Sequence, residues 1–263
     1  MNGVDISEYQ GLIDWATLVN HVGFVIIKVT EGKDYLDKQF STNRQGARDA
    51  KMCRGYYHFA RFDSPGYNNT PEEEADWFAD MVGTNLQPGE FVALDYEVTT
   101  TDEVAKCKRF RDRFFDRTGV KVGWLYSFIS KFNAHDWTPI GDIGIWVAAP
   151  SYGVSANHDN VPINYTYLMQ QYGESPVDGS NGSTDLNHFW GDRAALEAYG
   201  VPIPPTPEPI PPTPEPLPTP TPEPIPEPTP EPVPEPLPTP PSLLDWITNL
   251  IKKIIEWLKG WKR

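Results

Sequence analysis

The sequence predicts an α/β fold, a (β/α) barrel within about the first 200 residues. Short apolar runs alternate with stretches patterned as amphipathic helices, and several of the runs are almost continuously apolar. Such runs are typical of strands covered on both faces, as in a parallel sheet flanked by helices. About seven or eight strands in one unit of this size favour a barrel over an open sheet, although the pattern leaves closure of the sheet open.

The strands are predicted at residues 3–6, 24–29, 55–59, 91–96, 120–126, 143–148 and 167–172. A helix is predicted at 70–82, because Thr70 as N-cap, Pro71 at the first position and Glu73 at N3 coincide. A second helix is predicted at 102–117, with an apolar stripe for core packing formed by Val104, Cys107, Phe110, Phe114 and Phe115. No glycine-rich phosphate loop follows the first strand, which weighs against a nucleotide-binding fold.

The composition changes abruptly near residue 201 and divides the chain into three parts. Residues 1–200 read as globular, whereas nearly every second residue of 201–241 is proline, which predicts an extended linker. In polyproline II at about 3.1 Å per residue this linker would span roughly 120 Å. Residues 242–263 are predicted to form a basic amphipathic helix that binds a membrane or envelope surface, associates with a second copy, or docks on the barrel.

The charge distribution bears on the partners of the chain. The formal net charge is −14, and the linker carries glutamates without any basic residue, whereas the last segment is basic. The acidic globular part should repel phosphate backbones, so nucleic acid is not an expected partner. Cys53 and Cys107 have no neighbouring Cys or His and are expected to be reduced and buried. No signal-peptide pattern and no apolar run of membrane-spanning length are found in the sequence.

Acidic residues recur in the strand-like runs. Asp95 and Glu97 close the run 91–94, Asp5 lies in the first run, and Asp185 lies in the strand-like segment 184–187. The carboxyl ends of the strands surround the active site of a barrel. Because side chains in a strand alternate, Asp95 and Glu97 should point to the same face, with Tyr96 on the other.

A buried pair of acids has a specific chemical use. Mutual repulsion and desolvation favour protonation, so one member should keep its proton at a pH well above its ordinary pKa. A carboxylic acid protonated near neutral pH can protonate the departing oxygen in glycoside cleavage, while an ionised partner stabilises positive charge at the anomeric carbon. Acid clusters at barrel mouths also bind divalent metals, so position alone leaves a metalloenzyme open.

Five motifs resemble the family 25 glycoside hydrolases, muramidase-type lysozymes found in many phage endolysins. The resemblance runs from the N-terminus to about Trp190, with the motifs in the order of the family. They are Gly3-Val4-Asp5-Ile6-Ser7 with Tyr9-Gln10-Gly11 and Ile13-Asp14-Trp15; Phe24-Val25-Ile26-Ile27-Lys28-Val29-Thr30-Glu31-Gly32; Gly55-Tyr56-Tyr57-His58-Phe59; Leu94-Asp95-Tyr96-Glu97; and Asp185-Leu186-Asn187-His188-Phe189.

The resemblance implies an irregular, TIM-like (β/α) barrel that hydrolyses the β-1,4 bond between N-acetylmuramic acid and N-acetylglucosamine in bacterial peptidoglycan. It implies Glu97 as general acid, Asp95 as its ionised partner, and Asp5 and Asp185 as the rest of an acidic floor, with no metal and no cofactor. It further implies retention through the substrate's own N-acetyl group, positioned by Asp95, with direct water attack and inversion as the alternative. The substrate groove is expected to be lined by Tyr57, Tyr126, Trp146, Gln171 and Tyr172.

Alternatives remain for individual residues and for the whole chain. Tyr57 and Tyr126 would equally suit core packing at strand ends, Lys28 and Glu31 are expected to form an ion pair, and His58 is expected to be a hydrogen-bonded core histidine. A competing function is a non-catalytic peptidoglycan-binding module with a membrane-active C-terminal helix. As an endolysin, the protein would be made in the host cytoplasm and act on the cell wall after release by another agent.

Overall fold

A computed structural model of the 263-residue chain describes residues 1–83, 85–154, 160–203, 248 and 252–253. The chain divides into two units, Met1–Pro207 and Glu208–Arg263. The first contains the predicted barrel. The predicted linker and the predicted C-terminal helix lie, except for Thr248, Lys252 and Lys253, outside the described residues.

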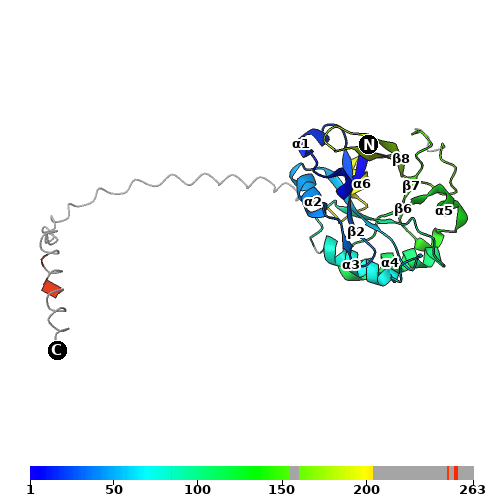
Figure 1. Ribbon diagram of the computed structural model, residues 1–263, viewed down its shortest axis with the longest axis horizontal. Helices are drawn as coiled ribbons and strands as arrows, with labels where there is room; N and C mark the ends of the chain where they lie inside the picture. Colours follow the sequence, from blue (N-terminus) through cyan, green and yellow to red (C-terminus); the bar gives the residue numbers. More distant parts are fainter. Residues whose placement is uncertain (84, 155–159, 204–247, 249–251, 254–263) are drawn as a thin grey trace, which may run out of the picture. The chain divides into compact units, whose positions relative to one another are not determined.

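The first unit is built on a closed sheet with helices outside it (Figure 1). The strands are β1 (Asn2–Ile6), β2 (Phe24–Glu31), β3 (Tyr35–Leu36), β4 (Cys53–Phe59), β5 (Phe91–Asp95), β6 (Trp124–Phe128), β7 (Gly144–Ala148), β8 (Met169–Pro176) and β9 (Ser183–Phe189). The helices are η1 (Glu8–Gln10), α1 (Trp15–Leu18), α2 (Phe40–Asp49), α3 (Pro71–Val82), α4 (Glu103–Thr118), α5 (Ile129–Ala134), η2 (Thr138–Ile140) and α6 (Arg193–Glu197).

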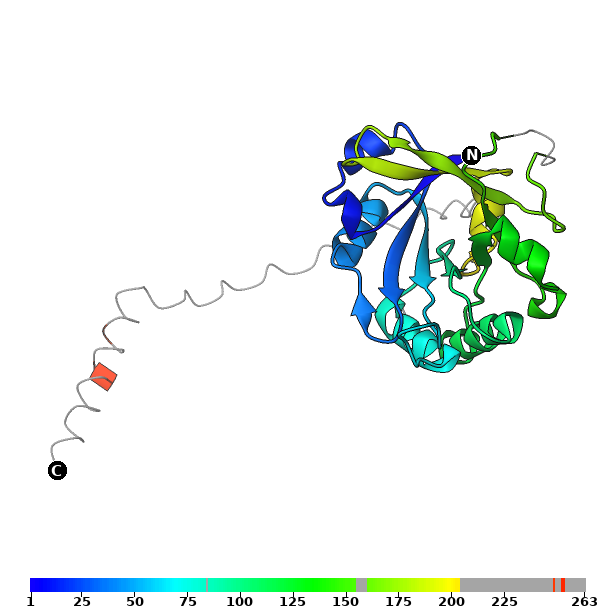
Figure 2. The ribbon, with the colours of Figure 1, turned by 45° about the vertical axis from the view of Figure 1, so that its right-hand side comes forward.

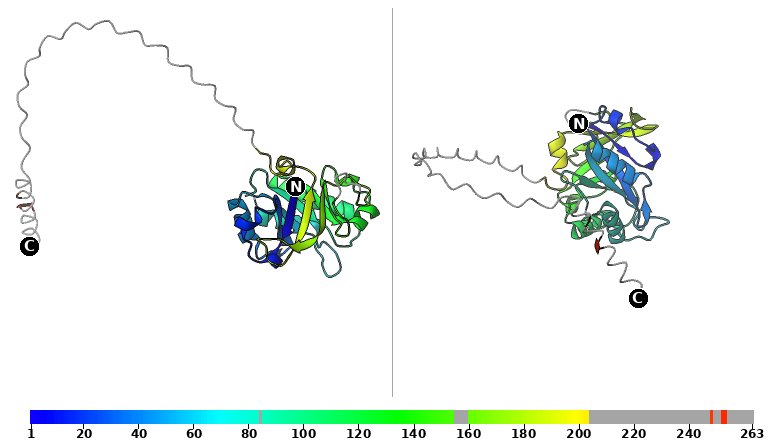
Figure 3. Two further views of the ribbon diagram at one scale, coloured as in Figure 1. Left: turned by 90° about the horizontal axis from the view of Figure 1, so that it is seen from above. Right: turned by 90° about the vertical axis from the view of Figure 1, so that its left-hand side faces the viewer.

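The strand order is β1-β9-β8-β7-β6-β5-β4-β2-β3, and an additional β1–β2 pairing closes eight of these strands into a barrel. The pairings from β1 through β2, β4, β5, β6 and β7 to β8 are parallel, and Figure 2 shows β2 and β4 running side by side. Strand β9 is antiparallel to both of its neighbours, and Figure 3 shows it beside β1 near the N-terminus. The α/β barrel is therefore confirmed, with a hairpin, β8–β9, as its irregularity.

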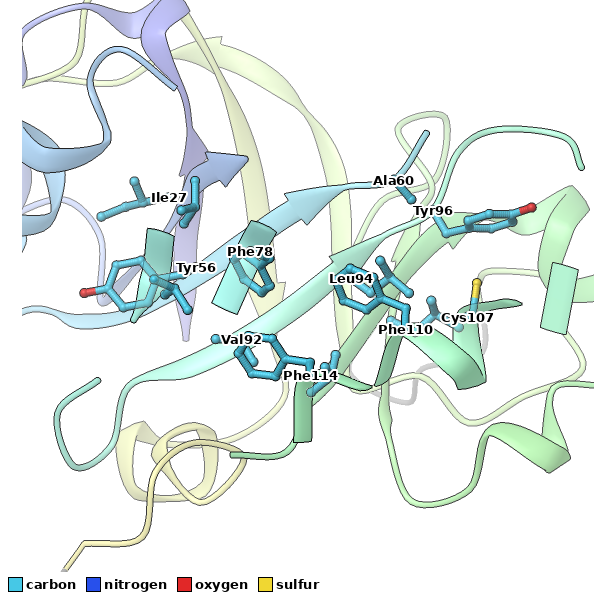
Figure 4. Packing of buried hydrophobic residues seen from close by; sticks show 14 of the residues in the cluster. Ile27, Tyr56, Ala60, Phe78, Val92, Leu94, Tyr96, Cys107, Phe110 and Phe114 are labelled. Atoms are coloured by element: carbon cyan, nitrogen blue, oxygen red, sulfur yellow. The ribbon is translucent and has the colours of Figure 1, made fainter. Parts of the chain in front are cut away.

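The strands bury both faces, as their continuous apolar runs predict. Along β5, Val92 and Leu94 belong to the core between sheet and helices, whereas Phe91 and Ala93 belong to a second core inside the barrel. Figure 4 shows the outer core, where Leu94 lies among side chains of the surrounding helices such as Phe110. The alternation follows the period of two along a strand, and it extends to Asp95, which therefore faces the barrel interior.

Several features of the predicted helices are confirmed. Helix α3 begins at Pro71 with a capping box between Thr70 and Glu73. Helix α4 occupies the predicted segment, and Cys107 is buried on its apolar stripe. The prediction was wrong for Phe115, which is 47% exposed. Phe114 faces the core, and the next residue along the helix points away from it.

Other details of the elements differ from the predictions. Strand β6 begins at Trp124 rather than at residue 120, and β3 was not predicted. Strand β9 extends the predicted strand-like segment that contains Asp185 at both ends. Cys53 and Cys107 are free and buried, as expected. Among the residues that the structure describes, no helix is long and apolar enough to cross a membrane.

Candidate active site

The register of the barrel aligns inward-facing side chains of neighbouring strands in two groups. Asp95 on β5 lies opposite Tyr126 on β6, and Tyr126 lies opposite Trp146 on β7. On the other side of the barrel, Asp5 on β1 lies opposite Asp185 on β9. These positions are at or near the carboxyl ends of the parallel strands, where barrel enzymes bind their substrates.

A cavity of about 270 Å³ opens between these two groups of side chains. It contains the four predicted acids and four of the five predicted groove residues, together with polar and aromatic side chains of the first strands and loops. Its lining residues are Asp5, Ile6, Ser7, Tyr9, Gln10, Lys28, Tyr57, Phe59, Asp95, Glu97, Tyr126, Trp146, Gln171 and Asp185.

Tyr172 is the predicted groove residue that does not line this cavity. The β8–β9 register shifts between Gln171 and Gly173, so Tyr172 is the extra residue of a bulge. A bulge interrupts the strict alternation of side chains along a strand. Gln171 lines the cavity, and Tyr172 next to it does not.

Asp95 and Glu97 form the acid pair, but only Asp95 belongs to β5. Glu97 lies two residues beyond it in an irregular segment, half-buried, whereas Asp95 is buried. The two carboxyl groups influence each other's titration, and among the described residues the buried Oδ1 of Asp95 has no hydrogen-bond partner. Burial, together with the neighbouring carboxylates, raises the pKa of Asp95 well above its ordinary value, and burial raises the pKa of Glu97. Burial thus favours a protonated Asp95 in the free site, whereas the resemblance implies an ionised partner for Glu97.

Asp5 is the centre of a hydrogen-bond network across the barrel. Its Oδ2 accepts from Asn187 Nδ2 at 2.7 Å and from Gln171 Nε2 at 3.1 Å. Tyr126 donates its hydroxyl proton to Gln171 Oε1 at 2.8 Å, and Trp146 Nε1 donates to Asn187 Oδ1 at 2.8 Å. Two of the predicted groove aromatics are therefore held in place by the amides that hold Asp5.

The network does not fully compensate the burial of Asp5. Burial and the Asp185 carboxylate raise the pKa of Asp5 to about 7, although the two amide donors act in the opposite direction. Burial and Glu174 also raise the pKa of Asp185. The cavity therefore holds several acids that remain protonated at a pH where exposed carboxyl groups are ionised.

A cationic wall faces the acids. Lys28 Nζ donates to Glu31 Oε2 at 2.7 Å, which confirms the predicted ion pair, and Arg61 donates to the other oxygen of Glu31. Lys28 lowers the pKa of both Asp95 and Glu97, which limits the rise caused by burial. The wall thus opposes full protonation of the acid pair.

Sequence reasoning assigned no role in the site to Asn187, Ser7, Tyr9 or Gln10. For Asn187 the signal was present, because it lies two residues after Asp185 in a strand-like run and so shares its face. The other three lie on or beside η1, just after β1, and the sequence marked them only as part of a motif.

The metal site that the acids alone left open is not supported by their geometry. Among the described residues, no group of three or more His, Cys, Asp or Glu side chains is arranged to hold a metal ion. Asp5 instead directs one oxygen at two amide N–H donors, which would compete with a cation for that oxygen.

Comparison with known proteins identifies the family of the chain. Residues 4–180 match the model of the glycosyl hydrolases family 25. The chain is 31% identical over 216 residues to Lysozyme M1 of Streptomyces globisporus, a match that covers 75% of this chain and 70% of that protein.

Solved structures are similar over the same part of the chain. The bacterial lysozyme from Streptomyces coelicolor has a TM-score of 0.61 and 28% identity, over 76% of this chain and 96% of that chain. The catalytic domain of endolysin ply40 from bacteriophage P40 of Listeria monocytogenes has a TM-score of 0.61 and 27% identity, over 75% of this chain and 97% of that domain. With the family model matched over most of the barrel, and with relatives of the same kind in sequence and in structure, the chain belongs to the glycosyl hydrolases of family 25.

Proposed function

We propose that the protein is a lysozyme that hydrolyses the β-1,4 bond between N-acetylmuramic acid and N-acetylglucosamine in bacterial peptidoglycan. The observation that carries this proposal is the acid pair Asp95 and Glu97, which both line the cavity of a family 25 barrel and have raised pKa values. A carboxyl group with a raised pKa keeps its proton near neutral pH and can transfer it to a glycosidic oxygen. Lysozyme M1 and the endolysin domain support the choice of substrate by their names.

Glu97 is the proton donor in this proposal, and Asp95 is its partner. Glu97 is the more exposed of the two and so the member that reaches the glycosidic oxygen. An acetamido N–H of the substrate that donates to Asp95 stabilises its ionised form and leaves the proton on Glu97. Asp95 then positions the acetamido group for attack on the anomeric carbon, with retention. Anomeric analysis of the first product by NMR separates retention from inversion.

The remaining lining residues have binding roles in this proposal. Tyr57, Tyr126 and Trp146 present aromatic surfaces to the apolar faces of the sugar rings, whereas Gln171 offers polar atoms to hydroxyl groups. Asp5 and Asp185 complete the acidic floor. Tyr57 and Tyr126 also suit the packing role that the sequence left open, since each is almost fully buried.

Glu97→Gln is the test of the proposed function. The substitution preserves size and removes the transferable proton, so clearing of a cell-wall suspension should fall by at least 100-fold, the range lost with a general acid. Mass analysis of the digest should find N-acetylmuramic acid at the new reducing ends. Equal clearing by both proteins would show that Glu97 is not the proton donor. A wild-type protein that binds cell walls without clearing them would favour the non-catalytic binding module.

The parts outside the barrel enter the proposal through their sequence. Residues 201–241 act as an extended linker and residues 242–263 as a basic amphipathic helix that attaches to a membrane or envelope surface, with self-association as the alternative. Deleting residues 242–263 should reduce binding to cells and spare hydrolysis of soluble wall fragments. If a synthetic peptide of these residues kills cells as well as the whole protein does, lysis comes mainly from the C-terminal helix, and the glycosidase activity has a secondary part in it. A role in host lysis, after release from the cytoplasm, completes the proposal.

A further inference from the structure

Glu97 lies just beyond the end of β5, and the last contact of this segment with the sheet backbone before Glu97 is the Tyr96 N–H, which donates to the Tyr126 carbonyl of β6 at 3.0 Å. Strand β5 ends at Asp95, and residues 96–100 run irregularly to the start of α4. Its orientation must therefore come from contacts made by neighbouring elements.

Both flanking carbonyl groups are held by the next β–α unit of the barrel. Ser127 Oγ, at the end of β6, donates to the Tyr96 carbonyl at 2.6 Å. Lys131 Nζ, on α5, donates to the Val98 carbonyl at 2.7 Å. Ser127 is fully buried, and the Lys131 side chain is 13% exposed. Glu97 is thus bracketed by two hydrogen bonds from one neighbouring unit.

Lys131 is itself fixed by a buried carboxylate. Its ammonium group donates to Glu103 Oε1 at 2.6 Å, and Glu103 is 4% exposed. The same oxygen accepts the Thr100 N–H at 3.3 Å, and the ammonium lies 5.4 Å from the centre of the Tyr96 ring. The Lys131 ammonium is largely removed from water, and these partners replace its hydration. Because losing one of them would leave a buried charge poorly compensated, the ammonium stays at the Val98 carbonyl.

We propose that Lys131, anchored by Glu103 and assisted by Ser127, is a positioning residue that holds the Glu97 carboxyl against Asp95 and over the cleft. This inference rests on the proposed function, in which Glu97 is the proton donor. Lys131 touches neither substrate nor the reacting atoms; it acts through the backbone of Val98. Small displacements of a catalytic group are costly, because proton transfer needs a defined geometry.

The inference predicts a specific change in the titration of Glu97. Burial keeps the pKa of this carboxyl raised. A loosened segment admits water, so the pKa should fall toward its ordinary value and the alkaline limb of the pH profile should move to lower pH. The substitution leaves in place the charged groups that face Glu97, namely Asp95, Asp185, Arg61 and Lys28.

The experiment compares Lys131→Met with Lys131→Arg and with Lys108→Met as the matched control. Lys108 pairs with Asp112 on the surface of α4, away from the segment that carries Glu97. Lys131→Met should lower kcat on soluble wall fragments by about tenfold, leave KM within about twofold, and shift the alkaline limb down by roughly half a pH unit or more. Lys131→Arg should restore most of kcat, and Lys108→Met should match the wild type.

Two results would overturn the inference: an unchanged kcat and pH profile in Lys131→Met, or a loss of activity that follows the unfolded fraction with no shift of the limb. If Lys131→Met does not fold, Ser127→Ala provides the same comparison from the other side of Glu97. Carbon-13 NMR titration of the Glu97 carboxyl reports its pKa without turnover. A wild type that does not cleave walls would therefore contradict the proposed function, while the NMR comparison still decides the role of Lys131.

Discussion

Asp5 and Asp185 are direct neighbours across the β1–β9 ladder, and this arrangement of two acids is energetically unfavourable when both are ionised. Directly opposed side chains in an antiparallel pair have Cβ atoms about 4.5–5.5 Å apart, and like charges at that separation destabilise the pair. The barrel tolerates it because Asn187 and Gln171 donate to Asp5 and because its proton is retained, with a pKa of about 7. Acid placement in the cavity thus makes folding stability depend on pH.

The sign of that dependence can be predicted for Asp5. Its pKa is raised in the folded state from the ordinary 3.8 to about 7, so the folded protein binds the proton more tightly than the unfolded chain does. The stability contributed by the proton is fully present below about pH 4 and is lost as the pH rises through about 7. Asp5→Asn removes this loss and should become more stable relative to the wild type across that window, by on the order of 2–4 kcal/mol.

Thermal unfolding of both proteins from pH 4 to pH 8 measures this difference. The Asn side chain can still accept from Asn187 and Gln171 through its carbonyl oxygen, so the network is preserved. A difference in stability that stays constant with pH would show that Asp5 does not carry the raised pKa.

At the scale of elements, the connection between β4 and α3 is organised by one buried carboxylate. Glu74, on α3, is fully buried and accepts from the backbone N–H groups of Arg61 and Phe62, and from Asn69. His58 Nε2 lies 2.9 Å from the same carboxylate, and its Nδ1 lies 2.9 Å from Thr30, which confirms the expected hydrogen-bonded core histidine. The same connection carries Arg61 to the cationic wall of the cleft.

Glu74→Gln should therefore destabilise the protein by about 2–3 kcal/mol, because an amide replaces one acceptor oxygen by a donor that faces other donors. Glu72→Gln is the matched control on the same helix. Glu72 forms an exposed ion pair with Arg109, and such pairs contribute about 0–1 kcal/mol. Urea unfolding measures both variants, and equal losses would contradict the role assigned to Glu74.

At the scale of the whole molecule, closure of the barrel depends on small residues that face inward opposite large ones. A Cβ atom on Gly55 would lie 2.1 Å from the Phe91 ring, and one on Gly3 would lie 2.5 Å from the Phe24 ring. Glycine at these positions lets aromatic side chains fill the barrel interior below the acids. The interior is therefore packed up to the floor of the cavity.

Gly55→Ala should destabilise the barrel by roughly 1–3 kcal/mol, the cost of overpacking a core. The double variant Gly55→Ala with Phe91→Leu should be less destabilised than the sum of the two single variants, because the smaller side chain relieves the clash. Thermal or urea unfolding of the four proteins completes the cycle. Additive losses would mean that Gly55 and Phe91 are not coupled.

The sequence predicted the helices and strands better than it predicted the surroundings of individual residues on them. Local signals were sufficient for α3, since the capping box of Thr70 and Glu73 and the proline at the first position act within one turn. Periodicity was less reliable at single positions. It gave Phe115 to the core, although Phe115 is 47% exposed on α4. The groove assignment of Tyr172 came from the family resemblance, and this residue is the extra one of the β8 bulge and does not line the cavity.

From the sequence alone, Asp95 and Tyr96 are expected on opposite faces of the sheet, because side chains alternate along any strand, and the closed barrel shows that the face of Asp95 is the interior. The tertiary structure alone decided which groups share the cavity. Asp5, Asp185 and Asn187 meet because β9 returns antiparallel beside β1, and Lys131 reaches the segment of Glu97 because β6 follows β5 in the sheet. Contacts of this kind join residues far apart in the chain, and they exist only once the barrel has closed.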